Sequence, residues 1–280
     1  MSRSLLRIFA LCLFPSWFSL AFAQQEMILA TTTSVQDTGL LDVIVPIFEQ
    51  QNGYRVKAVA VGTGQALAMA GKGEADVVLA HAPETEKKYV SEGVLVHRRL
   101  VMHNTFLLAG PAADPAKVKE TTAAVDALKK IAAAQAPFIS RGDDSGTHKL
   151  EKKLWEQAGI TPAGDWYLEA GQGMGRTLSI AGEKQAYVIA DRATYLAFQK
   201  TTGLAVLLQG DPLFLNLYHV LEVNPEKFPK VNATGGKAFA DFLLSPTVQD
   251  MLKTFGMDKF GEPLFHPDAG RTEAEVQKQP

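Results

Sequence analysis

Three short segments of the sequence combine hydroxyl side chains with glycine or arginine. Residues 31–34 read Thr-Thr-Thr-Ser, residues 62–64 read Gly-Thr-Gly, and residues 140–147 read Ser-Arg-Gly-Asp-Asp-Ser-Gly-Thr. Each segment follows an apolar, strand-like run and precedes a helical pattern. The first N–H groups of a helix lack intrahelical partners, and the helix dipole makes that end positive, so such turns can bind anions. Hydroxyls add neutral donors, and glycine allows close approach of the backbone. The three segments therefore predict a site that holds a small oxyanion.

Each segment also has a purely structural interpretation. Serine and threonine are preferred helix N-caps, so any one segment alone is explained by capping. Arg141 alone would be explained by a surface ion pair with Asp143 or Asp144. Because segments of one type recur in both halves of the chain, we favour a ligand site. There Arg141 would supply the charged donors that suit a tetrahedral anion.

The elements around these segments alternate between strands and helices. Strands are expected at residues 27–30, 55–61, 76–80, 105–110, 138–140, 186–190 and 217–223. Helices are expected at residues 65–69, 83–91, 125–134, 147–158, 174–183, 237–244 and 247–255. A further helix covers Leu40 to Phe48, with Asp37 as its expected N-cap, and Pro46 should kink or end it. The polar stretch from His266 is expected to be disordered.

This alternation predicts an α/β protein of two lobes, each a mostly parallel sheet flanked by helices, with the ligand between them. The segment Pro-Ala-Ala-Asp-Pro at residues 111–115 indicates a boundary. The predicted organisation begins with a signal peptide at residues 1–23 and a first segment of lobe 1 at 24–110. Lobe 2 follows at 111–213, the chain returns to lobe 1 at 214–265, and a polar tail covers 266–280.

The N-terminal segment has the features of an export signal. Arg3 and Arg7 precede a mostly apolar run at residues 8–22, and Ala-Phe-Ala favours cleavage after Ala23. Cys12, the only cysteine, lies in the segment to be removed, so the periplasm would receive a chain without thiols. The composition, 46% hydrophobic and 21% charged, is typical of a globular protein. Since no basic run accompanies the net charge of −2, no nucleic-acid partner is expected.

Other chemistries fit the sequence less well. The segment Gly-Asp-Asp-Ser-Gly at residues 142–146 leaves open a periplasmic serine hydrolase that uses Ser145, but Gly-x-Ser-x-Gly is absent and sequence cannot place His148 at the hydroxyl. The six histidines are scattered without metal spacing and are interpreted as surface or core residues, so neither a metal nor another cofactor is expected. The glycine-rich turn at residues 171–175 and Arg192 stay without an assigned role.

Three motifs resemble the tungstate-binding substrate proteins of bacterial ABC importers. They are ATTTSVQDTGLL at residues 30–41, RGDDSGTH at residues 141–148 and YVIADRATY at residues 187–195. The resemblance implies a type II periplasmic binding-protein fold whose lobes are joined by crossover strands. It also implies a monomer that delivers its ligand to an ABC permease in the inner membrane, without catalysis.

Carried over by position, the resemblance implies an oxyanion contact from Arg141 and donors from five hydroxyl residues, which are Thr33, Ser34, Thr63, Ser145 and Thr147. Ala190 stands where many members of this family have a hydroxyl residue, so no contact is carried over there. Phosphate, sulfate or molybdate in place of tungstate remain alternatives, because sequence does not report the radius of the site.

Overall fold

The computed structural model describes residues 24–278, and the predicted signal peptide lies outside these residues. The helices are α1 (Thr33–Asp37), α2 (Leu40–Asn52), α3 (Thr63–Gly71), α4 (Pro83–Ser91), α5 (Ala124–Ala134), α6 (Gly146–Gln157), α7 (Met174–Lys184), α8 (Arg192–Thr202), α9 (Ala233–Leu243), α10 (Pro246–Leu252), α11 (Met257–Phe260) and α12 (Glu273–Gln277). Within the described part, none of these helices is long and apolar enough to cross a membrane.

The main sheet is mixed, which corrects the expectation of mostly parallel sheets. Its strand order is β10 (His266–Pro267), β4 (Leu95–Gly110), β9 (Leu215–Val223), β3 (Val77–Ala80), β1 (Gln25–Thr32) and β2 (Tyr54–Val61). Strand β1 is parallel to β2 and β3, as the strand–helix alternation predicts. Strand β9 lies between β3 and β4 and is antiparallel to both.

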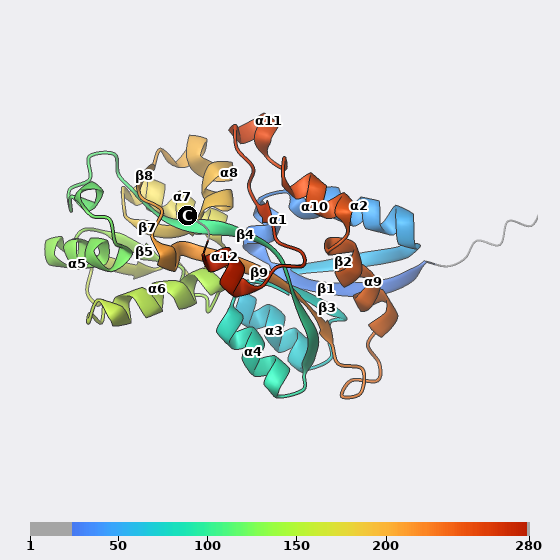
Figure 1. Ribbon diagram of the computed structural model, residues 1–280. Helices are drawn as coiled ribbons and strands as arrows, with labels where there is room; N and C mark the ends of the chain where they lie inside the picture. The colour runs from blue at the N-terminus through green and yellow to red at the C-terminus, as the bar shows by residue number, and fades with distance from the viewer. Residues whose placement is uncertain (1–23, 279–280) are drawn as a thin grey trace, which may run out of the picture.

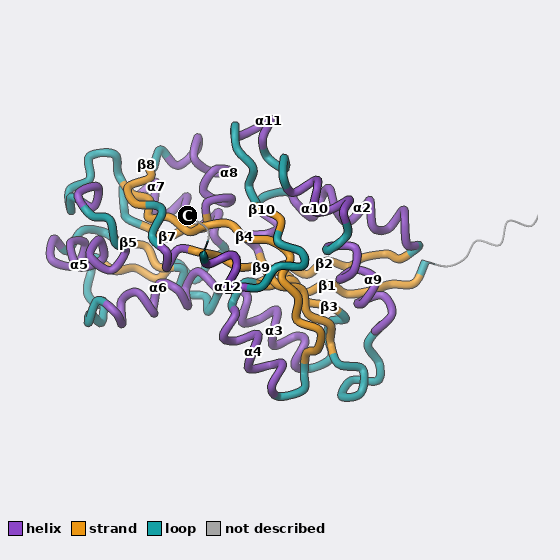
Figure 2. The backbone as a smooth tube through the Cα atoms, in the orientation of Figure 1, coloured by secondary structure: helices purple, strands orange, loops and turns teal. Residues whose placement is uncertain are grey.

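Strand β4 is 16 residues long and takes part in two regions of the molecule (Figure 1). Its first part pairs with β9, and its last residues pair with β7 (Val188–Asp191) and β8 (Ala205–Leu208). Strands β5 (Phe138–Ser140) and β6 (Tyr167–Glu169) form a separate parallel pair. In Figure 2, helices α5 to α8 gather around one end of β4, and α2, α3, α4 and α9 gather around the other.

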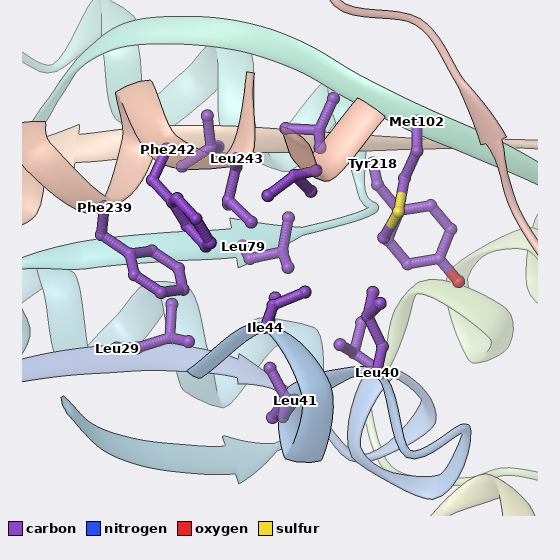
Figure 3. Packing of buried hydrophobic residues seen from close by; sticks show 14 of the residues in the cluster. Leu29, Leu40, Leu41, Ile44, Leu79, Met102, Tyr218, Phe239, Phe242 and Leu243 are labelled. Atoms are coloured by element: carbon purple, nitrogen blue, oxygen red, sulfur yellow. The ribbon is translucent and has the colours of Figure 1, made fainter. Parts of the chain in front are cut away.

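Helix α2 continues through Pro46, so the proline does not end the helix, which was one of the two outcomes expected of it. One face of α2 buries Leu40, Leu41, Ile44 and Phe48 in the core, whereas Pro46 is exposed. Figure 3 shows Ile44 directed toward Leu79 of β3. Burial of four large apolar side chains, at roughly 1.5–3 kcal/mol each, outweighs the ~3 kcal/mol cost of proline within a helix.

The C-terminal segment is ordered up to residue 278, contrary to the expectation of disorder. Strand β10 pairs with β4, and the buried carboxylate of Asp268 lies 2.6 Å from His103 Nδ1. Helix α12 begins with a complete capping box at Thr272, and its buried Val276 clusters with Leu100 and Leu217. The sequence does not reveal these contacts, because each depends on a single residue within a segment of polar composition.

Candidate anion-binding site

The turn after β1 begins helix α1. Thr31 donates from Oγ1 to the carbonyl oxygen of Leu79, 3.0 Å away, and Thr32 is the N-cap whose hydroxyl accepts from Val35 N. These two hydroxyls are therefore used by the fold. Thr33 and Ser34 follow as the first two helical residues, where N–H groups lack intrahelical partners. Thr33 and Ser34 thus lie at the start of α1, a short helix that precedes the one expected from the sequence.

The turn after β2 contacts the turn after β5. Thr63 is fully buried, and its Oγ1 accepts from the N–H of Gly146 at 3.2 Å, across 83 residues of sequence. A Cβ atom at Gly64 would lie 2.2 Å from Asp144 Oδ2 and 3.1 Å from the Asp144 carbonyl oxygen. The absence of a side chain at Gly64 therefore favours the close approach of two of the three predicted segments.

Arg141 is 2% exposed, which excludes the interpretation as a surface residue. Its Nε donates to the carbonyl oxygen of Gln172 at 2.9 Å, and its Nη2 pairs with the carboxylate of Asp143. Asp143 is itself held by the N–H of Ser145, 3.1 Å from Oδ1. The guanidinium is thus fixed from two sides, while Nη1 donates to no group in the described part of the chain.

Helix α6 carries the other two predicted ligand residues. Ser145 is its N-cap, and the hydroxyl accepts from His148 N at 3.2 Å. Thr147 is fully buried, and its Oγ1 has no hydrogen-bond partner within residues 24–278. Because buried hydroxyls are nearly always paired, this unpaired donor is a candidate ligand contact.

We expected Asp37 to cap α2, but the N-cap of this helix is Gly39. Asp37 instead ends α1 and accepts from Gly175 N at 3.2 Å, at the start of α7. Burial raises the pKa of this carboxyl, which the Gly175 N–H and Arg141 partly offset. The glycine-rich turn at residues 171–175 therefore has a role: it orients Arg141 through Gln172 and contacts α1 through Gly175.

Sequence reasoning missed His81, which follows β3 and is 4% exposed. Its Nε2 lies 3.3 Å from Ser34 Oγ, and its Nδ1 lies 3.0 Å from Asn216 Oδ1. Its backbone lies against α6, since a Cβ at Gly146 would be 2.7 Å from the His81 carbonyl oxygen. A lone histidine after a buried strand is typical of core packing, so only its place beside Ser34 reveals it.

A cleft of about 1010 Å³ borders this arrangement, and His81, Gly146 and Asn216 are among its lining residues. The serine-hydrolase alternative finds no support in the geometry. The Ser145 hydroxyl accepts from a backbone N–H, and the ring of His148 accepts from Asp144 N at 3.0 Å. Arg192, left open by the sequence, pairs with Glu262 at 2.7 Å.

The fold agrees with a family comparison, in which residues 22–247 match the family described as the PBP superfamily domain. The chain is thus a member of this superfamily of binding proteins. It is 49% identical, over 251 residues, to the tungstate-binding protein TupA of Peptoclostridium acidaminophilum, which covers 89% of this chain and 88% of that relative.

Two solved structures are similar. The tungstate ABC transporter protein from Geobacter sulfurreducens is 45% identical with a TM-score of 0.74, covering 81% of this chain and 97% of its own. The tungstate-binding protein TupA from Desulfovibrio alaskensis G20 is 42% identical with a TM-score of 0.72, covering 88% and 99%. The chain belongs to the TupA family of tungstate-binding proteins.

Proposed function

We propose that this protein binds tungstate in the periplasm and presents it to an ABC permease of the inner membrane, as a monomer without enzymatic activity. Relatives named as tungstate-binding, at 42–49% identity over most of the chain, support the ligand. The observation that carries the proposal is Arg141, a buried cation held by two partners with Nη1 left for a ligand.

In this proposal the fold is a type II periplasmic binding protein with two lobes. Lobe 1 comprises residues 24–110 and 214–265, lobe 2 comprises residues 111–213, and the polar tail follows at 266–280. The separate apolar clusters around Phe48 and around Phe138 support this division. Strands β4 and β9 would be the crossover strands, and the contacts of Thr63 with Gly146 and of Asp37 with Gly175 would join the lobes when they close.

The ligand shell in this proposal combines Arg141 with hydroxyls and free N–H groups at three helix starts. The hydroxyl donors would be Thr33, Ser34, Thr63, Ser145 and Thr147. Thr147 has the strongest support, because its buried hydroxyl is unpaired. Donors that are fixed before binding replace the hydration of a dianion without rearrangement, which favours tight binding.

Calorimetric titration tests the function and the role of Arg141 together. Tungstate should bind in a one-to-one ratio, and competition with molybdate, sulfate and phosphate ranks the alternative anions. Arg141→Ala should weaken binding by about 1.5–3 kcal/mol, because a charge-assisted hydrogen bond is lost. Arg192→Ala, which removes an arginine paired with Glu262, is the matched control and should bind normally. Absence of heat with all four anions would contradict the function.

A further inference from the structure

His81 stands at the centre of a buried polar network next to Ser34. Its ring lies 4.7 Å from that of Tyr218, between centroids, and Figure 3 shows the Tyr218 hydroxyl directed away from the apolar cluster. Asn216 reaches the ring from β9 and Ser34 reaches it from α1. The ring therefore has one polar partner on each nitrogen, and the two partners come from opposite sides.

Asn216 determines which ring nitrogen carries the hydrogen. In the amide orientation of the structure, Asn216 Nδ2 donates to Asn104 Oδ1 at 2.8 Å and to the Tyr218 hydroxyl at 2.9 Å. Asn216 Oδ1 is then an acceptor, so His81 Nδ1 must be the donor toward it. A neutral imidazole has only one N–H group, which leaves Nε2 as an acceptor.

The Ser34 hydroxyl is the group that donates to Nε2. A hydroxyl has a single hydrogen, so a Ser34 that donates to His81 cannot also donate to an oxyanion. Thr32 can satisfy the acceptor side of Ser34, since the two hydroxyl oxygens are 3.1 Å apart. With this tautomer the hydroxyl hydrogen of Ser34 is thus directed toward His81 Nε2.

Charged groups around His81 make its protonation sensitive to an anion. The pKa of His81 is lowered to about 4: burial is the largest cause and Arg141 also lowers the pKa, whereas Glu86, Asn216 and Asp143 raise it. These groups lie on α4, on β9 and on the turn before α6, and Tyr218 beside the ring is neutral because burial raises its pKa. A dianion at Arg141 offsets the guanidinium charge and adds negative charge, so it shifts His81 toward the imidazolium form.

We propose that His81 is a positioning residue that sets the direction of the Ser34 hydroxyl, and that anion binding adds a proton to His81 Nε2. The proposal rests on the proposed function. A proton from solvent forms the Nε2–H bond, Ser34 Oγ accepts from it, and the Ser34 hydrogen turns to a ligand oxygen. No electrons are transferred.

Calorimetry in two buffers measures this proton. Tungstate, dilute enough to stay monomeric, is titrated at about pH 7 in PIPES and in Tris, whose ionisation enthalpies differ. The wild-type protein should take up a measurable fraction of a proton, at most one, on binding. Its affinity should rise as the pH falls, by at most about tenfold per pH unit.

Variants identify the group that takes up the proton. His81→Gln keeps a donor and an acceptor but cannot titrate, so it should bind tungstate without proton uptake. His148→Gln, which removes another half-buried histidine near the site, should retain the uptake. If His81→Gln does not fold, ¹⁵N spectra of wild-type histidine nitrogens provide the same readout, because one neutral ring should become doubly protonated with tungstate.

Equal binding heats in both buffers for the wild-type protein would overturn this proposal and leave tungstate binding intact. Proton uptake that persists in His81→Gln would overturn it as well. Absence of any tungstate heat would contradict the proposed function itself, and with it the role of His81.

Discussion

Close backbone contacts at single residues define the site. Gly146 illustrates this, because its N–H reaches Thr63 while its Cα faces His81, and both partners are distant in sequence. The sequence places Arg141 and Ser145 in a turn between a strand and a helix, as the structure has them, because hydroxyls and glycine after a strand have a recognisable chemistry; their contact with a ligand stays a prediction. It could not predict the contact with His81, which depends on how two separate turns meet.

Gly146→Ala should weaken tungstate binding by about tenfold or more, as expected for 1–3 kcal/mol of overpacking. The added Cβ would lie 2.7 Å from the His81 carbonyl oxygen and 2.8 Å from its Nδ1. The clash is between the turn that holds Gly146 and the turn that holds His81, and these two turns would separate if the lobes open. The unliganded protein should therefore keep its melting temperature. Gly71→Ala, whose Cβ would meet only the Tyr89 ring, is the control and should bind as the wild type does. Unchanged affinity of Gly146→Ala would show that these turns do not meet in the bound state.

At the scale of elements, apolar spacing predicted most helices and strands, with α4 and β5 at their observed bounds. The extent of β4 was not predictable, because the interval with His97, Arg98 and Arg99 lacks apolar alternation. Arg98 and Arg99 are accommodated by ion pairs with Glu86, Glu273 and Glu222, and His97 Nδ1 lies 3.0 Å from a Glu222 carboxylate oxygen. Pairings of this kind are a property of the assembled sheet and leave no local pattern.

Helix α6 carries a buried carboxyl whose charge should make stability depend on pH. Glu151 is 1% exposed, and burial raises its pKa to about 7, although Tyr167 and Trp155 donate to it. A raised pKa means that the folded protein binds this proton more tightly than the unfolded chain does. The stabilisation is therefore complete below about pH 4.5 and is lost as the pH rises through about 7.

Glu151→Gln mimics the protonated form and should remove this loss. At about pH 8.5 the variant should be more stable than the wild type by ~1–3 kcal/mol, and the difference should shrink toward about pH 5. Urea unfolding at a series of pH values measures it. Glu156→Gln, which changes an exposed carboxylate of the same helix, is the control variant. A constant difference for Glu151→Gln would refute the buried-carboxyl explanation.

At the scale of the whole molecule, an ion-pair cluster joins the long strands to the C-terminal segment. Arg98 of β4 contacts both Glu86, which is fully buried, and Glu273 of α12, while His219 of β9 lies 3.1 Å from Glu86. Glu86 also accepts from Ala82 N at the start of α4. The cluster therefore ties four elements together across the strands that run between the two ends of the molecule.

Arg98→Met should destabilise the protein by about 3–5 kcal/mol, because it leaves the buried Glu86 without its arginine. Glu273→Gln should cost less, since its carboxylate is partly exposed and Arg98 keeps Glu86 as partner. Equilibrium unfolding of the two variants compares these costs. Equal losses would indicate that the contact with α12, instead of the buried pair, provides the stabilisation.

The position of β10 and α12 against β4 also has a practical consequence. The only cysteine, Cys12, precedes the described residues and lies in the segment predicted to be cleaved, so a cysteine introduced near Glu273 would be a unique attachment point for a dye. The dye would lie beside strands β4 and β9, so its surroundings would change if these long strands rearranged. If the lobes close on the anion as proposed, such a dye would report the occupancy of the site, because Glu273 and His81 line the same cleft.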